Sequence, residues 1–394
     1  MNILLINDYL EGGGAEAVFR EQYDILRPDF HVELFTAFDK FIDRKKTPFS
    51  YIYSIRFKQQ LSRLLKKKSF DFVIVHNYSS ALSPSILDVL AGYKKMNKCK
   101  IIHYAHDFHL LSPNRGYCYY QKGKIVNFTT PPSIRKILFK RIDARGIIYS
   151  LLKKIQWICA YTIGKKHKVF DLVLAPSDFL VQQIQIRYPD MNVKRLYNVC
   201  NSLTSIHPEK QRSKDKSGQL KLVYFGRLDP IKGLPNFLNA LKNFPMDYSF
   251  TMIGEGEELP IIQACIEQYQ IGDKIILLPK LNQAELFAKL QQYDVFVLPS
   301  FIYENAPLSI IEAASLGLSV FVSRHGGIFE MGKLCNASHF LNPFDLEDVA
   351  RNLHILYEDF LADRLPKADF ALLQTLFSRE TYINNLKSYL RHES

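Results

Sequence analysis

The sequence predicts two doubly wound α/β domains, each built around a parallel sheet. The chain has 394 residues, which is about twice the usual size of one domain. Short runs rich in Val, Ile and Leu alternate with stretches compatible with helices, as expected for a parallel sheet covered on both faces. This alternation stops near residue 210 and then starts again. We therefore expect two domains of the same class.

In the first half of the chain, the alternation begins with the apolar run NILLIN at residues 2–7, followed by a helix expected over 15–26. A basic helix is expected over 59–68. The further expected strands are, in chain order, HVELFTA, DFVIVHN, KIIHYAH and DLVLAPS. The polar segment 201–218, with its run of Lys, Arg, Ser and Asp, predicts a linker.

The second half repeats the same alternation after the linker. Its expected strands are LKLVYFG, YSFTMIG, KIILLP, YDVFVLP and LSVFVS, and a helix-compatible stretch follows each of them. The pattern therefore predicts a second parallel sheet with its own helices.

Cysteine usage and the N-terminus indicate a protein of the reducing cytoplasm. The six cysteines lie far apart with no CxxC pair, which argues against a zinc knuckle or a disulfide framework. The first residues have no basic segment before their short apolar run, so they predict a buried first strand rather than a signal peptide. No uncharged apolar run approaches the roughly 18 residues of a membrane span.

The net charge of +12 belongs to the first half of the chain. Residues 1–200 hold 32 Lys and Arg against 16 Asp and Glu, a net +16, while the remainder has 19 against 23, a net −4; the two sum to +12. Such asymmetry indicates an anionic partner for the first half. Nucleic acid is not expected, because the basic segments form no recognisable reading module.

The segment 131–168 has apolar residues at helical spacing among ten Lys and Arg and one Asp, with an interruption at Gly146. One interpretation is that residues 134–168 lie on an anionic membrane surface, with Trp157 near the headgroups. The other is a core helix with a basic face turned to solvent. The sequence leaves both open.

The most informative segment is VFVLPSFIYENAPLSIIEAASLG, residues 295–317. An expected strand ends at Pro299, a loop carries Glu304, and Pro307 suits the first turn of a helix that runs to about Leu316. The loop therefore lies at the carboxyl end of a parallel strand, where open α/β sheets bind ligands. Free N–H groups at the helix start favour phosphate oxygens, and the carboxylates of Glu304 and Glu312 favour sugar hydroxyls.

On this Glu-x7-Glu segment the chain resembles the GT-B fold glycosyltransferases, specifically the retaining family 4, or glycosyl transferases group 1. The resemblance extends to LVYFGRLDPIKGL, MIGEGEEL, LPKLNQAEL and HGGIFE in the second half. It implies two Rossmann-like doubly wound domains facing across a cleft. It places the acceptor-side domain at 1–205 and the donor-binding domain at 206–374, with a C-terminal helix over about 375–394 packing back on the first domain.

The resemblance implies retaining transfer of a hexose-type sugar from a nucleoside-diphosphate sugar, with a UDP-sugar favoured and no metal or other cofactor. Glu312 would hold the ribose, Arg227 and Lys232 the diphosphate, and Glu304 the hexose. The residues implied as catalytic are His106, Glu304, Arg227 and Lys232. The residues implied in donor binding are Gly13, Gly14, Gly226, Arg227, Lys232, Gly254, Glu255, Leu281, Glu304, Asn305, Ala306, Pro307, Leu308 and Glu312, and those on the acceptor side are Asp107, His109, Asn114 and Arg115.

Two other motifs are weighed against this reading. The spacing EGGGAE lacks the third glycine of a dinucleotide fingerprint. His103, His106 and His109 are spaced i, i+3, i+6, which suits neither one face of a strand nor the i, i+4 zinc helix. No DxD motif occurs in the sequence. A metal site is therefore not expected.

The expected partners are a nucleotide sugar and a glycan or lipid-linked glycan, as in the assembly of bacterial capsule, O-antigen or lipopolysaccharide. The expected location is the cytoplasm or the inner face of its membrane, and the sequence sets no oligomeric state. Two rival functions remain: another sugar-nucleotide enzyme of this fold, such as an epimerase, and a catalytically degenerate glycan-binding subunit docked on a membrane.

Overall fold

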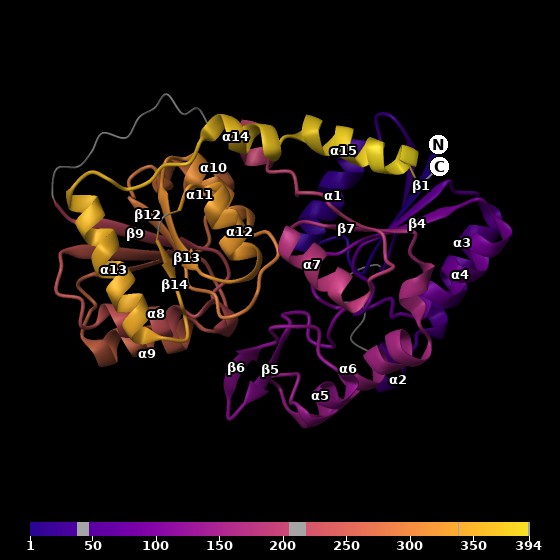
Figure 1. Cartoon of the computed structure of the whole chain (residues 1–394), viewed down its shortest axis with the longest axis horizontal. Coiled ribbons are helices and arrows are strands. Elements are labelled where there is room, and N and C mark those ends of the chain that lie inside the picture. The colour runs from indigo at the N-terminus through magenta and orange to yellow at the C-terminus, as the bar shows by residue number, and fades with distance from the viewer. Residues whose placement is uncertain (38–46, 205–217, 338, 393–394) are drawn as a thin grey trace. The chain divides into compact units, whose positions relative to one another are not determined.

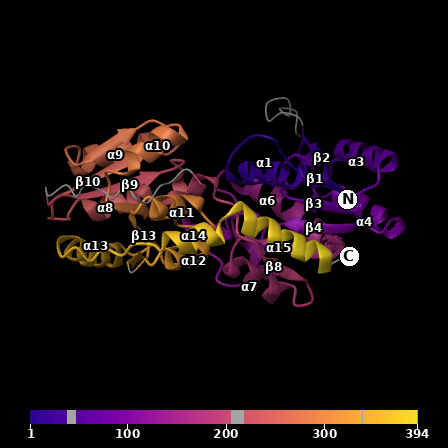
Figure 2. The same ribbon diagram turned by 90° about the horizontal axis from the view of Figure 1, so that it is seen from above.

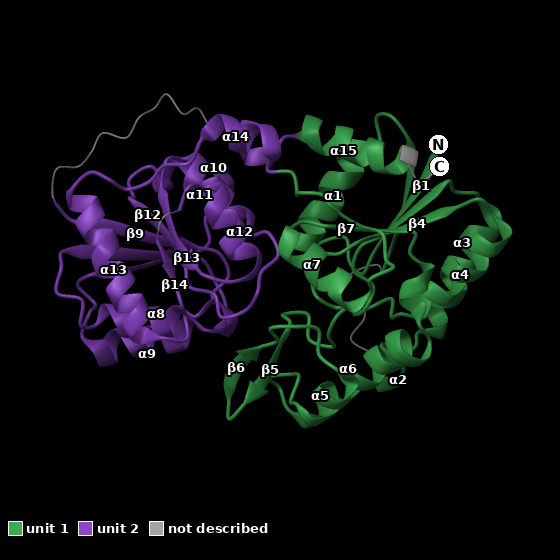
Figure 3. Cartoon of the chain, in the orientation of Figure 1, with its two compact units in different colours: residues 1–199, 379–394 green, residues 200–378 purple. Residues whose placement is uncertain are grey.

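The computed structural model describes residues 1–37, 47–204, 218–337 and 339–392. The chain forms two compact units (Figure 3): unit 1 comprises Met1–Val199 with Arg379–Ser394, and unit 2 comprises Cys200–Ser378. Each unit contains one parallel six-stranded sheet, which confirms the predicted pair of parallel-sheet α/β domains. Residues 201–204 of the predicted linker form a 3-10 turn, η3, and 205–217 lie outside the described residues.

The sheet of unit 1 has the strand order β2-β1-β3-β4-β7-β8. Seen from above (Figure 2), β2, β1, β3 and β4 follow one another in this order. Leu5 of β1 lies opposite Leu34 of β2 and Ile74 of β3, so apolar side chains line up across the sheet. The strands are β1 Asn2–Asn7, β2 His31–Thr36, β3 Phe72–Val75, β4 Lys100–Tyr104, β7 Leu172–Ala175 and β8 Val193–Arg195.

Unit 1 is completed by helices from both ends of the chain (Figure 1). The last helix, α15 (Arg379–His392), places Tyr382, Leu386 and Leu390 in the same core as Phe19 of α1. The other helices are α1 Gly14–Leu26, α2 Pro48–Ile52, α3 Ile55–Lys67, α4 Ile86–Met96, α5 Ile134–Phe139, α6 Ile147–Trp157, the π-helix η1 Ile158–Ile163, the 3-10 turn η2 Lys166–Val169 and α7 Asp178–Arg187. An antiparallel hairpin, β5 Cys118–Gln121 with β6 Lys124–Asn127, was not predicted.

The sheet of unit 2 has the order β11-β10-β9-β12-β13-β14. Its strands are β9 Leu220–Phe225, β10 Tyr248–Ile253, β11 Ile275–Leu278, β12 Val295–Leu298, β13 Ser319–Ser323 and β14 Phe340–Leu341. Its helices are the short η4 Pro230–Lys232, α8 Leu234–Leu241, α9 Leu259–Tyr269, α10 Gln283–Leu290, α11 Leu308–Ser315, α12 Gly326–Leu334, α13 Leu346–Leu361 and α14 Phe370–Leu376.

One of the two interpretations of residues 134–168 placed Trp157 near lipid headgroups, and that placement is wrong. The Trp157 side chain is fully buried, and its indole Nε1 donates to the carbonyl oxygen of His109 at 2.7 Å. The Arg187 guanidinium covers the indole ring at 4.8 Å from its centre. The indole therefore anchors the end of α6 inside unit 1, because its polar N–H and its ring both find partners there.

Candidate functional site

The loops that follow β9, β10, β12 and β13 lie at the carboxyl edge of the sheet of unit 2, the ligand-binding edge of open α/β sheets. Backbone hydrogen bonds connect them. Leu228 N donates to Glu255 O at 2.9 Å, which joins the loops after β9 and β10, and Phe301 N donates to Ile231 O at 2.8 Å, which joins those after β12 and β9. The loops after β9, β10 and β12 are therefore parts of one connected surface.

Lys232 and Glu304 form the centre of this surface. The Lys232 Nζ lies 2.9 Å from each carboxylate oxygen of Glu304, across 72 positions of sequence. Both side chains are largely buried, with 16% and 17% of their surface exposed. An ammonium that holds both oxygens of a carboxylate fixes the position of each group, and places a cation for an anionic ligand beside an acceptor for hydroxyl groups.

Arg227 lies on the same loop as Lys232 but makes a separate ion pair. Its guanidinium contacts the Asp229 carboxylate at 2.6 Å and is 72% exposed. The loop is held from the strand side, where Tyr224 OH donates to the carbonyl oxygen of Arg227 at 2.6 Å. The two predicted diphosphate-binding cations thus share a loop and differ in burial.

Glu312 lies one turn inside α11. Its carboxylate accepts a hydrogen bond from Ser202 Oγ at 3.2 Å. Burial raises the pKa of Glu312 to about 7, because the charged form loses water, and the Ser202 hydroxyl opposes this only in part. Pro307 occupies the N-cap, so α11 begins at Leu308, one residue later than predicted.

The HGG segment packs directly against the loop that carries Glu304. A Cβ atom added at Gly327 would lie 1.7 Å from the carbonyl oxygen of Asn305, so only glycine allows this approach of the two backbones. The Asn305 side chain is buried. The close packing of Gly327 against this loop therefore helps to fix the position of Glu304.

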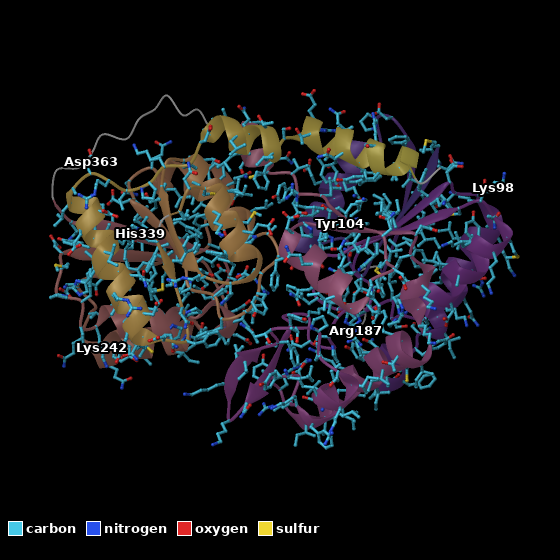
Figure 4. All side chains as sticks on the ribbon, viewed as in Figure 1. Lys98, Tyr104, Arg187, Lys242, His339 and Asp363 are labelled. Carbon is cyan, nitrogen blue, oxygen red and sulfur yellow. The ribbon has the colours of Figure 1, made fainter. Side chains whose placement is uncertain are left out.

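In unit 1, His106 belongs to a buried network of hydrogen bonds. His106 Nε2 lies 2.7 Å from His76 Nδ1, and His76 Nε2 lies 2.7 Å from Gln22 Oε1. Gln22 Nε2 donates to Tyr382 OH at 2.6 Å. The His76 ring stacks on Tyr104, whose side chain lies inside unit 1 (Figure 4). Burial lowers the pKa of His106 to about 3 and holds that of His76 well below its usual value, so both rings are neutral near pH 7.

Two of the predicted acceptor-side residues form an ion-pair cluster. Arg115 contacts Asp107 at 3.1 Å and Asp8 at 3.4 Å, and donates to Ser79 Oγ at 2.8 Å. Asp8 in turn accepts the N–H groups of residues 80–82, which shapes the loop after β3. Arg115 is therefore held in one place by carboxylates on two loops.

The other two predicted acceptor-side residues are engaged in holding the fold. Asn114 Nδ2 donates to Ile142 O at 2.6 Å, and its Oδ1 accepts Gly116 N at 2.7 Å. His109 is buried between Tyr78 and Tyr161. The predicted contact of Asn114 and His109 with an acceptor thus rests on the sequence resemblance alone.

The three histidines of the 103–109 segment have separate surroundings. His103 Nδ1 lies 2.8 Å from Val75 O, and its ring stacks on Phe170, whereas His106 contacts His76. Among the residues that the structure describes, no three His, Cys, Asp or Glu side chains gather as metal ligands would.

The glycine loop of unit 1 leads into α1, with Gly13 at the N-cap and Gly14 as the first helical residue. A Cβ atom added at Gly14 would meet no atom within 4 Å, and the residue has no left-handed backbone angle. The fold itself therefore does not require glycine there, in contrast to Gly327. The space beside Gly14, at a helix N-terminus, is open to a ligand.

Several residues of these surroundings were missed by sequence reasoning. His76 is the next-to-last residue of the run DFVIVHN, and Asp8 follows the run NILLIN, so both had a signal at strand ends. Ser202 and Gln22 had no such signal in the sequence. Glu258 is a buried carboxyl whose pKa is raised to about 7 by burial and by the charges of Asp229 and Glu257.

Comparison with known proteins shows what this chain is similar to. Residues 206–364 match the family model described as glycosyl transferases group 1. The chain is 23% identical to the O-antigen biosynthesis glycosyltransferase WbnH of Escherichia coli over 362 residues, and this alignment covers 91% of each chain. Among solved structures, the apo form of the lipopolysaccharide outer core galactosyltransferase WaaB superposes with a TM-score of 0.70 at 16% sequence identity. Anabaena Alr3699/HepE in complex with UDP and glucose superposes with a TM-score of 0.65 at 16% sequence identity. Both comparisons cover 100% of each chain.

Two parallel-sheet α/β units with these structural neighbours show the GT-B fold, and the match over residues 206–364 together with the named relatives supports a glycosyltransferase. Within that class its second unit carries the domain of the glycosyl transferases group 1. The resemblance inferred from the Glu-x7-Glu segment is thereby confirmed for the fold, and the family match covers residues 206–364.

Proposed function

We propose that this enzyme transfers a hexose, with retention of anomeric configuration, from a nucleoside-diphosphate sugar to a glycan acceptor. A UDP-sugar is the favoured donor, and the favoured process is the assembly of a bacterial cell-surface polysaccharide such as capsule, O-antigen or lipopolysaccharide. The observation that carries the proposal is the contact of Lys232 with Glu304 beside the N-terminus of α11.

The donor's diphosphate is the group that this surface suits best. Lys232 supplies a fixed and largely buried cation, and Arg227 an exposed one on the same loop. Negative charge grows on the diphosphate as the sugar leaves, so fixed cations there stabilise the transition state more than the bound donor. The first N–H groups of α11, near Asn305 and Ala306, add donors for phosphate or sugar oxygens.

Glu304 and Glu312 serve different parts of the same donor on this proposal. Glu304 would accept hydrogen bonds from hydroxyl groups of the hexose, and Glu312 would accept them from hydroxyl groups of the ribose. An acceptor hydroxyl oxygen would then form a bond to the anomeric carbon on the face from which the diphosphate departs. The bond to the phosphate oxygen breaks, and that oxygen takes the acceptor's proton, so no separate nucleophile is required.

The residues of unit 1 are proposed to serve the sugar side of the reaction. His106 is neutral and held by His76, which suits it to a hydrogen bond with a sugar hydroxyl rather than to proton transfer. Gly13 and Gly14 are proposed to face the donor, and a Cβ atom added at Gly14 would meet no atom within 4 Å. Arg115 and Asp107 are proposed to face the acceptor.

The named relatives support the donor and the process. The relative WbnH is named for O-antigen biosynthesis, and the similar fold of HepE was solved with UDP and glucose. We further propose that the reaction needs no metal, with Lys232 and Arg227 neutralising the diphosphate, and that the enzyme works in the cytoplasm. Transfer should then continue unchanged in excess EDTA.

A thermal-shift screen against UDP-, GDP-, ADP- and CMP-sugars tests the donor assignment, because a ligand that binds only the folded state raises its stability. We expect UDP-sugars to give the largest shift. No shift with any nucleotide sugar would contradict the donor site. Product analysis with and without a glycan acceptor separates the rivals: an epimerase changes the sugar without acceptor, and a degenerate binding subunit changes nothing.

A further inference from the structure

The helices α5 and α6 and the π-helix η1 expose an unusual amount of apolar surface. Of the 22 large apolar side chains that are exposed in the described part of the chain, nine lie between residues 134 and 163, far more than this short segment would hold by chance. Contiguous exposed apolar patches in soluble proteins mark binding surfaces. We name this set the apolar patch; it comprises Ile134, Leu138, Phe139, Ile147, Ile148, Tyr149, Leu151, Ile155 and Ile163.

Helix α6 is turned with its polar side chains inward. Its buried residues are Ser150, Gln156 and Trp157, whereas Ile147 and Ile148 are 80% and 75% exposed. An ordinary surface helix of a soluble protein has the opposite arrangement. The side chains of Ile148, Leu151 and Ile155, spaced i, i+3, i+7, therefore form a stripe along the outer face.

This orientation is fixed by specific hydrogen bonds. Gln156 Nε2 donates to Tyr51 O at 2.6 Å and to Ser79 O at 2.9 Å. Ser150 Oγ accepts Asp143 N at 2.9 Å and donates to Gly146 O at 2.8 Å. Turning the apolar stripe inward would break these bonds and the indole contact of Trp157, and would leave buried polar groups without partners.

The charges around the apolar patch are almost all positive. Residues 131–168 contain ten Lys and Arg and a single acidic residue, Asp143. That carboxylate is already paired with Arg145 at 2.9 Å and with Lys153 at 2.8 Å. Arg135, Lys165 and Lys168 have no salt bridge within the part of the chain that the structure describes. A partner must therefore combine apolar surface with negative charge.

We propose that the apolar patch of unit 1 docks the enzyme on a bilayer that contains anionic phospholipid. The stripe of α6 would enter the boundary between headgroups and acyl chains, and the surrounding Lys and Arg would contact lipid phosphates. No helix within the described ranges is long and apolar enough to span a membrane, so docking is of the surface kind. A second copy of this face fits poorly, because two such basic surfaces repel each other.

A further exposed aromatic ring comes from α2. Phe49 of α2, a helix that packs against α6, is 64% exposed. Trp157, the chain's one tryptophan, lies buried beneath α6. Its fluorescence therefore reports whether α6 stays folded, and lipids with brominated acyl chains should leave this emission unquenched on docking.

Cosedimentation of the full chain with vesicles tests the docking. Wild type should bind vesicles of phosphatidylcholine and phosphatidylglycerol at least tenfold more tightly than vesicles of phosphatidylcholine alone, and added salt should weaken the binding. Ile148→Glu should reduce binding at least tenfold without changing Trp157 emission or the hydrolysis of nucleotide sugar. The matched control is Ile261→Glu on α9 of unit 2, which is 53% exposed and should bind as wild type does.

Three outcomes would overturn the proposal: no binding to anionic vesicles, equal binding to neutral ones, or unaltered binding of Ile148→Glu. A dimer in solution that Ile148→Glu dissociates, with no vesicle binding, would assign the patch to a second copy instead. The donor chemistry is read independently from nucleotide-sugar hydrolysis, so a failure of docking does not bear on it.

Discussion

The ammonium of Lys232 lies 2.9 Å from both carboxylate oxygens of Glu304. The pair is largely withdrawn from water, so each group depends on the other for its position. A ligand with both an anionic group and hydroxyl groups would find a cation for the first, Lys232, and a hydrogen-bond acceptor for the second, Glu304, already in place.

Replacing Lys232 by Met should therefore cost both activity and stability. We expect transfer to fall at least 100-fold, since the loss of one fixed donor at a developing charge costs about 2.7 to 4 kcal/mol. Because Glu304 would lose its partner while partly buried, the free energy of unfolding should fall by about 1 to 3 kcal/mol. The matched control is Lys242→Met, at the exposed end of α8 (Figure 4). Similar turnover in both variants would rule out a role for Lys232 in catalysis.

Gly14→Ala should separate ligand contact from folding. Because an added Cβ meets no protein atom, urea denaturation should show unchanged stability or a gain of up to about 1 kcal/mol. Turnover should fall at least tenfold, since the new methyl group occupies the space proposed for the donor. Gly92→Ala on α4, where a Cβ atom also meets nothing, should keep full turnover. Full activity of Gly14→Ala would mean that no ligand approaches this helix start.

Glu312 should make the stability of the enzyme depend on pH. Its pKa is raised to about 7 in the folded state from 4.5, so between these values the folded chain binds more protons than the unfolded chain. Its contribution to stability is therefore lost as the pH rises from about 4.5 to 7, by an amount on the order of 2 to 3 kcal/mol. Denaturation of wild type and Glu312→Gln across this range measures it: the variant should gain on wild type as the pH rises.

Donor binding should release the proton that the Glu312 carboxyl takes up on folding. If ribose hydroxyls donate to Glu312, its charged form is favoured, and binding of a UDP-sugar near pH 6.5 should release a proton. Calorimetry in buffers of different ionisation enthalpy measures this release. Proton release that persists in Glu312→Gln would assign the linkage to another group, such as Glu258.

His106 should act without changing its charge. Since burial lowers its pKa to about 3, the ring stays neutral over the working range of pH. His106→Asn should reduce the transfer rate at least tenfold while the pH profile between about 6 and 8 keeps its shape. A limb of the profile that disappears in the variant would instead show that His106 titrates during turnover.

The strand ends were the part of the site that the sequence could predict. Glu304 follows a buried apolar run and precedes a helix, and parallel strands bring such positions to one edge of a sheet. The short strands β8 and β14, of three and two residues, were missed because so few positions carry no periodicity. The Lys232–Glu304 contact joins residues 72 positions apart, and the pattern predicted its two loops without predicting the ion pair.

The face that a helix buries was harder to predict than the helix itself. Periodicity in 131–168 identified which apolar residues share a face, but not that Ser150 and Gln156 would turn inward. The partners that fix Gln156 are the backbone oxygens of Tyr51 and Ser79, which lie 105 and 77 positions away. For this reason the sequence left two placements of Trp157 open, at a membrane surface or in the core, and the side chain is buried.

Calorimetric titration of the full chain with the nucleotide sugar that stabilises it most tests the central claim most directly. We predict that Glu304→Ala weakens donor binding at least tenfold, while replacement of the exposed Glu267 on α9 by Ala leaves the Kd of wild type unchanged. Equal Kd values for wild type and Glu304→Ala would contradict the placement of the donor beside Lys232 and Glu304.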